Sequence, residues 1–98
     1  MLTKSYSKTG KVCRVTFKLP AEVNADQAAL CGEFNEWDAA VNPMKQLKNG
    51  TFSATVSLPA GESYRYRYLL DSERWENDWE ADAYASNEYG SDDSIVVV

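Results

Sequence analysis

The stretch YRYRYLLDSERW, residues 64–75, alternates tyrosine with arginine before a short polar turn and a tryptophan. Successive side chains of a β-strand point to opposite faces of the sheet, so the three tyrosines share one face with Leu70 and the two arginines share the other. The tyrosine face is predicted to pack in a core, because a tyrosine ring buries well when its hydroxyl reaches the sheet edge or a backbone group. Arg65 and Arg67 are therefore expected on the outer surface of the sheet.

The position of Trp75 depends on the length of the turn before it. A loop of residues 72–73 pairs Trp75 with Leu70 and places the indole in the core. A loop of residues 72–74 pairs Trp75 with Asp71 and places the indole on the outer face beside the arginines. The Asn-Gly and Asp-Gly pairs that two-residue loops prefer are absent, which favours the longer loop. A tryptophan exposed beside an arginine on a sheet face indicates a binding surface.

The same two-residue alternation recurs in residues 11–19, 25–34 and 50–58, and the chain ends on the apolar residues 94–98. Helical periodicity is missing throughout. Short strands separated by Gly, Pro, Asn and Asp turns predict an all-β sandwich of immunoglobulin-like type. The side chains expected on the core faces of the additional strands are Cys13, Val15, Phe17, Leu19, Ala28, Leu30, Phe52, Ala54, Val56 and Leu58.

The chain has 98 residues, 44% of them hydrophobic, which is the usual size of one domain with one core. We therefore expect a single domain over residues 1–98, with the polar residues 1–10 as a flexible N-terminal segment. No uninterrupted apolar run is long enough for a signal peptide or a membrane span, which predicts a soluble cytoplasmic protein without a membrane partner. Since the sequence starts at Met1 and ends on the last predicted strand, we expect a stand-alone module.

The chain carries 10 Lys and Arg against 15 Asp and Glu, which opposes nucleic-acid binding because a basic surface is needed to displace counterions from phosphates. It contains no histidine, which removes the usual general base, zinc ligand and Ser-His or Cys-His dyad. Two carboxylates about 5 to 9.5 Å apart across a cleft can hydrolyse a glycoside, but so small a domain rarely encloses such a cleft. No enzyme activity and no cofactor are therefore expected.

Two further patterns concern metal and cysteine chemistry. The acidic residues 76–82, ENDWEAD, lack the glycine-centred loop of an EF-hand, so no metal site is expected, and Asn77 and Asp78 are predicted to shape the turn with side-chain hydrogen bonds. Cys13 falls with the apolar set of its strand, whereas Cys31 falls opposite the apolar set of its own. A disulfide needs Cβ atoms about 3.5 to 4.5 Å apart, so two free thiols are expected, as in a reducing compartment.

A second exposed tryptophan is suggested by CGEFNEWD, residues 31–38. The acidic and amide neighbours of Trp37 favour a surface loop that follows the strand ending at Gly32. The alternative interpretation is that Trp37 plugs the end of the sandwich.

Four motifs occur in the order LCGEFNEWD, LPAGESYRYRYLLD, RWENDWEADAY and NEYGSDDSIVVV. Together they resemble the glycogen-binding module of AMP-activated kinase β subunits and the early-set domains of branching enzymes and isoamylases, that is, carbohydrate-binding module family 48. The resemblance extends from about Val12 to Val98. It implies an immunoglobulin-like, early-set sandwich that binds α-1,4-glucans such as glycogen, starch or malto-oligosaccharides on one sheet surface.

The resemblance also implies a set of site residues. The binding tryptophan of the Gly-x-Phe-Asn-x-Trp motif falls on Trp37, the basic residue of the central strand on Arg67, and the second tryptophan on Trp75. Asp93 and Ser94 stand in the last turn, where the family often has asparagine, and both can bond sugar hydroxyls. Indole rings can cover the apolar faces of glucose, while arginine and amide groups bond its rim of hydroxyls.

Departures from the family leave two alternatives. Trp79 stands where the family typically has proline, and it either extends the sugar platform or packs on the sandwich edge, of which packing is favoured. The main alternative function is an early-set domain that holds no sugar and docks onto a protein partner, such as a glycogen- or starch-metabolising enzyme.

Overall fold

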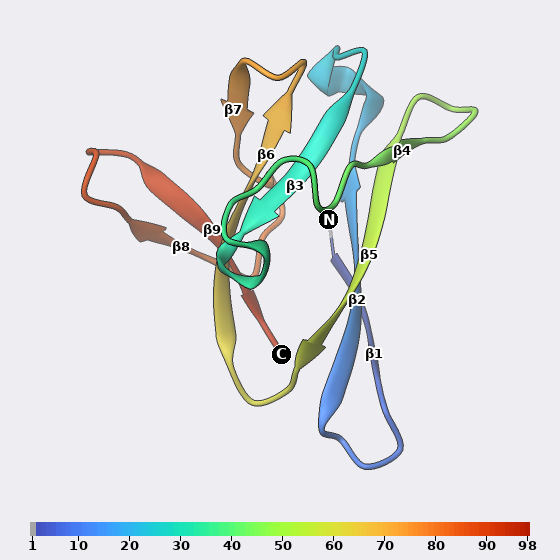
Figure 1. Ribbon diagram of the computed structural model, residues 1–98, viewed down its shortest axis with the longest axis vertical. Helices are drawn as coiled ribbons and strands as arrows, with labels where there is room; N and C mark the ends of the chain where they lie inside the picture. Colours follow the sequence, from blue (N-terminus) through green and yellow to red (C-terminus); the bar gives the residue numbers. More distant parts are fainter. Residues whose placement is uncertain (1) are drawn as a thin grey trace.

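The computed structural model describes residues 2–98, which form two antiparallel sheets packed face to face (Figure 1). One sheet has the strand order β1-β2-β5-β4 and the other β3-β6-β9-β8, with β7 paired to β6. The prediction of an all-β, immunoglobulin-like sandwich is confirmed. The elements are β1 (Leu2–Tyr6), β2 (Val12–Leu19), the 3-10 turn η1 (Ala21–Val23), β3 (Ala28–Gly32), the 3-10 turn η2 (Glu33–Asn35), β4 (Lys45–Gln46), β5 (Phe52–Pro59), β6 (Ser63–Leu70), β7 (Arg74–Glu76), β8 (Ala83–Ser86) and β9 (Asp92–Val97).

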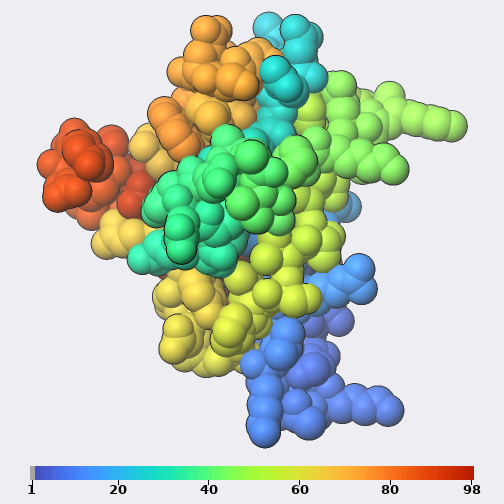
Figure 2. All heavy atoms as spheres, in the orientation of Figure 1, coloured from blue at the N-terminus to red at the C-terminus, as the bar shows by residue number. Residues whose placement is uncertain are grey.

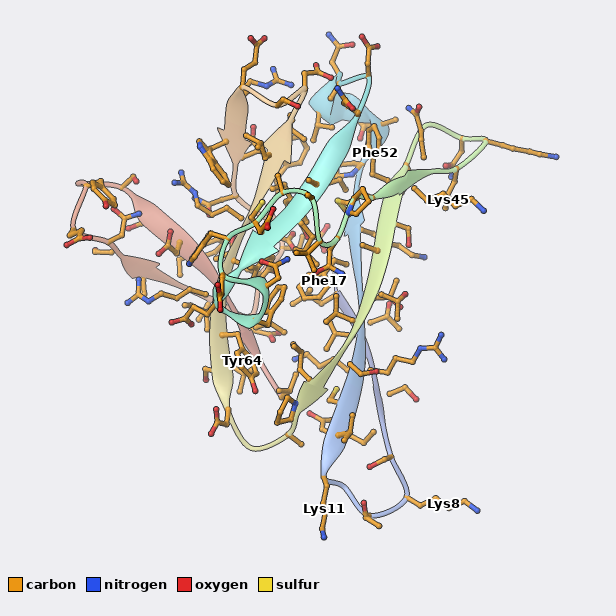
Figure 3. All side chains as sticks on the ribbon, viewed as in Figure 1. Lys8, Lys11, Phe17, Lys45, Phe52 and Tyr64 are labelled. Atoms are coloured by element: carbon orange, nitrogen blue, oxygen red, sulfur yellow. The ribbon has the colours of Figure 1, made fainter. Side chains whose placement is uncertain are left out.

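The core lies between the two sheets, where Figure 3 places the ring of Phe17. This ring meets the edge of the Tyr66 ring at a centroid distance of 5.0 Å, and Tyr66 in turn meets Tyr68 at 5.8 Å. The core faces predicted from the alternation are confirmed, with Ala54, Val56 and Tyr64 partly buried and the other predicted members buried. Packing of aromatic edges against faces stabilises such a core beyond the burial of area alone.

The hydroxyl of Tyr64 donates to the backbone carbonyl of Pro59 at 3.1 Å, as predicted, but the other two tyrosine hydroxyls of β6 find a partner that the alternation did not indicate. Tyr66 and Tyr68 both donate a hydrogen bond to Oδ2 of Asp78, at 2.8 and 3.1 Å. Asp78 is 2% exposed, and its backbone N–H donates to Oγ of Ser94 at 2.9 Å. Burial and then the nearby Asp78 carboxylate raise the pKa of Tyr68, and burial is also the largest cause of the raised pKa of Tyr66. A buried carboxylate therefore satisfies both rings, in place of the sheet edge or a backbone group.

The turn that contains Asp78 is shaped by side-chain hydrogen bonds, as predicted. Oδ1 of Asp78 accepts from the backbone N–H of Glu80 at 2.9 Å, and Nδ2 of Asn77 donates to the carbonyl of Asp92 at 2.8 Å. These bonds join the turn to β9, which begins at Asp92. Within residues 2–98, no group of three or more His, Cys, Asp or Glu side chains is arranged to hold a metal ion.

The start of the chain differs from the flexible segment expected for residues 1–10. Leu2–Tyr6 form β1, which pairs along its whole length with β2, while Met1 lies outside the described residues. Leu2 packs against the core, and Nζ of Lys4 bonds Oδ2 of Asp82 at 2.6 Å. The expectation was wrong for β1, because the apolar side chain of Leu2, the Lys4–Asp82 ion pair and pairing with β2 along the whole strand hold this polar segment in place. Lys8 and Lys11 lie at the β1–β2 turn and point away from the body (Figure 3).

Both cysteines are buried and free, as predicted. Cys13 belongs to the core, and Cys31 lies on the opposite face of β3, where its backbone pairs with Arg67 of β6. Burial, and secondarily the negative charge of Asp38, raise the pKa of the Cys31 thiol, which keeps it protonated and unreactive. No helix among residues 2–98 is long and apolar enough to cross a membrane.

Candidate functional site

The outer face of β6 carries two arginines, as the alternation predicted. The residues that alternate with them, Tyr66 and Tyr68, are fully buried on the core side, which leaves Arg65 and Arg67 on the outer side. Arg67 pairs across the sheet with Cys31 of β3, whereas Arg65 pairs with Ile95 of β9. The two guanidinium groups therefore stand on the strand at the centre of the second sheet, where neighbouring elements can surround them.

Trp75 lies on the same outer face, but in a register that differs from the expected one. The loop comprises residues 71–73, so Trp75 pairs with Leu69 and not with Asp71. Both partners point to the same face, which is why the face was predicted correctly although the pairing was wrong. Asp71 is held out of the strand because its Oδ1 accepts hydrogen bonds from the backbone of residues 26 and 27, at 2.8 and 3.0 Å. Asp71 and Ser72 then take left-handed backbone conformations, with φ of 53° and 60°.

The indole of Trp75 and the guanidinium of Arg67 are neighbours. The guanidinium carbon lies 5.9 Å from the centroid of the Trp75 ring, within the range of a cation–π contact. Trp75 is 44% exposed, and Nε of Arg67 is buried without a hydrogen-bond partner among residues 2–98. A buried donor without a partner is costly to a fold, so this nitrogen lowers the stability of the site.

Trp37 is positioned by the segment that follows β3. Asn35 turns this segment back, since its Oδ1 accepts from the backbone N–H of Gly32 at 3.0 Å and its Nδ2 donates to the carbonyl of Leu30 at 2.9 Å. Glu36 and Trp37 then adopt left-handed conformations, with φ of 56° and 59°. The backbone N–H of Trp37 closes the turn on the carbonyl of Gly32 at 2.9 Å. The indole lies outside the core, so it does not plug the end of the sandwich.

The turn between β8 and β9 forms a further wall. Asn87 organises it, because its Oδ1 accepts from the backbone N–H of Tyr89 at 3.0 Å and of Ser91 at 3.2 Å. Tyr89 stands at the tip of this hairpin and is 85% exposed. Figure 1 shows the hairpin projecting sideways from the sandwich, and in Figure 2 its red tip stands apart from the green segment after β3. An exposed aromatic ring on a braced turn is suited to contact a ligand.

Arg65 ties the hairpin to the centre of the sheet. Its Nη1 bonds Oδ2 of Asp93 at 3.1 Å and the carbonyl of Ser86 at 3.2 Å, while its backbone N–H donates to Oε1 of Glu33 at 2.6 Å. Asp93 also accepts from Nδ2 of Asn87 at 3.2 Å. Asp93 is 6% exposed and therefore acts mainly as a support for Arg65 and the hairpin.

These elements surround a hollow of about 650 Å³ on the outer face of the second sheet, which we call the indole hollow. Four of the five residues predicted for the site line it, namely Trp37, Arg67, Trp75 and Asp93. The residues that line it and were not predicted for the site are Glu33, Arg65, Ser86, Asn87, Glu88 and Tyr89. Arg65 could have been found, since it shares a face with Arg67, and Tyr89 is an aromatic residue in a polar turn. That Arg65 and Tyr89 line the same hollow could not have been predicted, because it requires β9 to pair with β6.

Ser94 is the predicted site residue that does not line the hollow. It is fully buried, and its Oγ donates to Oδ1 of Asn77 at 2.8 Å and accepts from the backbone N–H of Asp78. The side chains of Asp93 and Ser94 point to opposite faces of β9, because neighbouring residues in a strand alternate. Ser94 therefore braces the buried carboxylate network and is removed from the predicted contact set.

The charges around the indole hollow nearly cancel. Two arginines face three carboxylates, those of Glu33, Glu88 and Asp93, and one of these is already paired with Arg65. The sequence contains no histidine, so no imidazole is present to act as a base or as a metal ligand. Flat aromatic rings beside fixed hydrogen-bonding groups suit the binding of a neutral, hydroxyl-rich ligand, whose apolar faces need covering and whose hydroxyls need partners.

Comparison with known proteins agrees with this geometry. The family model of carbohydrate-binding module 48, the isoamylase N-terminal domain, matches residues 5–85, which include β2–β7 and five of the ten residues that line the indole hollow. None of the curated proteins compared with the chain matches it.

Proposed function

The chain belongs to the carbohydrate-binding module 48 family, and from this premise we propose that it binds α-1,4-glucans, such as glycogen, starch or malto-oligosaccharides, in the indole hollow. The observation that supports this proposal most directly is the meeting of two partly exposed indoles from separate elements. Trp37 comes from the turn after β3 and Trp75 from β7, and both line one hollow on the outer sheet face. Such convergence of aromatic rings far apart in the sequence is expected of a binding site.

The chemistry of the hollow suits a glucan chain. The C–H faces of successive glucose rings can stack on the indoles and on the Tyr89 ring, because each ring is flat and partly exposed. Hydroxyl groups can accept hydrogen bonds from the guanidinium group of Arg67, whose side chain lines the hollow. The formal net charge of −5 opposes a polyanionic ligand and places no obstacle before a neutral polymer.

We further propose that the chain acts by binding and not by catalysis. Its family is a carbohydrate-binding module, and the hollow offers hydrogen-bonding and stacking groups without a histidine base. Incubation with starch is expected to release no reducing sugar. Two buried free thiols support the prediction of a reducing, cytoplasmic environment.

The proposal is tested by two-dimensional NMR of amide and indole N–H groups during titration with maltoheptaose, with cellohexaose as the control for linkage. Shifts at Trp37, Trp75 and the β6 backbone, for the α-linked sugar alone, are the expected result. The Trp37→Ala/Trp75→Ala double variant should lose the maltoheptaose shifts of the β6 backbone and keep its fold. Tyr6→Ala is the matched control, since Tyr6 is 53% exposed on β1 and does not line the hollow.

Retention of the β6 backbone shifts by the double variant would contradict the proposed site. Absence of any indole shift at millimolar sugar would contradict the function and would favour the alternative, an early-set domain that docks onto a glycogen- or starch-metabolising enzyme. Pull-down of such an enzyme by the wild type, and its loss in the same double variant, would then identify the indole hollow as a protein contact.

A further inference from the structure

A second hollow of about 270 Å³ lies at a different place on the molecule. It shares no lining residue with the indole hollow, and its aromatic member is Trp79. Trp79 lines this second hollow and not the indole hollow, so it does not extend the Trp37–Trp75 platform. It is 54% exposed, so packing on the sandwich edge covers only part of the ring, and an exposed indole in a concave setting needs an explanation of its own.

The Trp79 ring is held in place although its surface is open. Its Nε1 donates to Oε1 of Glu76 at 3.3 Å, which fixes the plane of the indole from one edge. The residues on each side are anchored, because Asp78 is buried under the two tyrosines and the backbone N–H of Glu80 donates to Oδ1 of Asp78. A ring that is ordered before binding loses little conformational entropy when a ligand stacks on it.

The opposite wall of this second hollow comes from the first sheet. Lys18 lies near the end of β2, and Leu47, Asn49 and Thr51 belong to the turn between β4 and β5. Oδ1 of Asn49 accepts from the backbone N–H of Thr51 at 3.0 Å, which leaves the Asn49 amide NH₂ and the Thr51 hydroxyl as possible partners for a ligand. Lys18 shares this lining with two carboxylates, those of Glu80 and the buried Asp78, so the hollow has no excess of positive charge for an anionic ligand.

We propose that this second hollow is an independent subsite for a neutral saccharide, an inference that rests on the glucan binding proposed above. One face of a glucose ring stacks on Trp79, and its hydroxyls bond Asn49, Thr51 and the charged groups at the rim. The volume of about 270 Å³ is below the lower end of sites for drug-sized ligands, roughly 300 Å³, so the subsite takes one or two sugar rings and not a long chain.

With two separate subsites, one molecule of the module can bind a polymer at two points. Glycogen presents many chain ends. When one chain end binds in the indole hollow, neighbouring chain ends are held close to the Trp79 subsite, and their effective concentration there rises. Affinity for glycogen is therefore expected to exceed affinity for maltotriose by more than the indole hollow alone provides. Wild-type protein should also cross-link glycogen particles and increase the turbidity of their suspension, which a monovalent module cannot do.

The experiment follows the indole N–H signals of the three tryptophans during titration with maltotriose in wild type and in Trp37→Ala/Trp75→Ala. The expected result is a Trp79 shift that persists in the double variant with an unchanged midpoint. In Trp79→Ala, the Trp37 and Trp75 shifts should be unchanged while glycogen affinity falls about 5- to 20-fold and turbidity is lost. Trp79→Phe, which keeps an aromatic face, should retain part of the avidity.

Three outcomes would overturn the subsite, and they separate it from the proposed function. Shifts at Trp37 and Trp75 without one at Trp79 would leave the function intact and remove the subsite. A Trp79 shift that disappears in the double variant would show one site with a distant effect. No shift at any of the three indoles would contradict both proposals. Dispersed amide spectra of each variant establish that loss of binding is not loss of fold.

Discussion

The guanidinium carbon of Arg67 and the ring centroid of Trp75 lie 5.9 Å apart, on residues of the adjacent strands β6 and β7. This contact orients the indole from one side, while the buried Nε of Arg67 makes no hydrogen bond within residues 2–98. Arg67 thus has a positioning role toward Trp75. This role can be separated from its effect on stability, because a buried donor without a partner lowers the stability of the fold and its removal does not.

Arg67→Met keeps most of the side-chain volume and removes the charge and the donors. We expect maltoheptaose affinity to fall about 5- to 10-fold, which corresponds to about 1 to 1.4 kcal/mol. The free energy of unfolding should be equal to that of wild type or higher by up to about 1 kcal/mol, because the lost contact with Trp75 is offset by removal of a buried donor without a partner. Isothermal titration calorimetry and urea denaturation measure the two quantities. Arg14→Met, an exposed change on β2, is the control and should alter neither.

The ion pair between Arg65 and Asp93 predicts a smaller effect on binding. Asp93→Asn removes the charge that holds Nη1 of Arg65 at 3.1 Å and retains an acceptor for Asn87. Glucan affinity is expected to fall about 3-fold as Arg65 and the hairpin become less ordered, which is under about 1 kcal/mol. Stability should change by less than about 1 kcal/mol, since the Arg65 side chain is 37% exposed. Equal affinity in Asp93→Asn and in the exposed neighbour variant Asp92→Asn would contradict a positioning role.

Tyr89 gives a prediction that depends on the length of the sugar. Its ring is 85% exposed at the tip of the β8–β9 turn, so Tyr89→Ala should leave stability within about 0.5 kcal/mol of wild type. If the ring contacts a sugar unit beyond those on the two indoles, maltoheptaose affinity falls severalfold and maltotriose affinity stays unchanged. Calorimetric titration with both sugars checks this. An equal loss for both would place Tyr89 against the units that stack on the indoles.

Much of this arrangement was predictable from local alternation, and the remainder was not. Arg67 and Trp75 point outward because side chains in a strand alternate with a period of two residues. The observed pairing of Trp75 differs from the expected one by two residues, and a shift of two leaves each side chain on the same face. The loop of residues 71–73 was missed because Asp71 bonds the backbone of Asp26 and Gln27, a contact far away in the sequence. The burial of Ser94 and the role of Asp78 were missed for the same reason. Long-range pairs determine which polar residues become support and which face a ligand.

The buried tyrosines predict a loss of stability at alkaline pH. Both phenols ionise near 10.0 in the unfolded chain, while burial and the Asp78 carboxylate raise their pKa in the folded protein. A raised folded pKa means that the contribution is fully present below pH 10 and is lost as pH rises above it. Each tyrosine then lowers the free energy of unfolding by about 1.4 kcal/mol per pH unit.

Urea denaturation between pH 8 and about 11.5 measures this slope. Tyr68→Phe should lower stability at pH 8 by about 1 to 2 kcal/mol, through loss of a hydrogen bond to a buried carboxylate, and should flatten the alkaline slope. Tyr89→Phe, which removes a phenol hydroxyl from the exposed turn, is the matched control and should leave the slope unchanged. An identical slope in wild type and Tyr68→Phe would contradict the link between burial and alkaline unfolding.

Gly32 connects the fold to the site, because the turn that carries Trp37 starts from it. A Cβ at this position would lie 2.7 Å from the carbonyl oxygen of Arg65 and 2.8 Å from the ring of Phe34. The φ of −168° is accessible to any residue, so the obstacle is steric and not conformational. Gly32→Ala should therefore cost about 1 to 3 kcal/mol of stability and displace the Phe34–Trp37 turn, with about a 10-fold loss of glucan affinity.

Gly10→Ala provides the contrast that isolates this steric effect. Gly10 has a φ of +73°, and no atom lies within 4 Å of the place that a Cβ would occupy, so alanine there is strained only by its backbone conformation. We expect it to lower stability by about 1 to 2 kcal/mol and leave glucan affinity unchanged. Matched denaturation and titration of the two variants then separate destabilisation from displacement of Trp37. Full affinity in Gly32→Ala would mean that the turn tolerates the methyl group and that close packing against Arg65 does not position the indole.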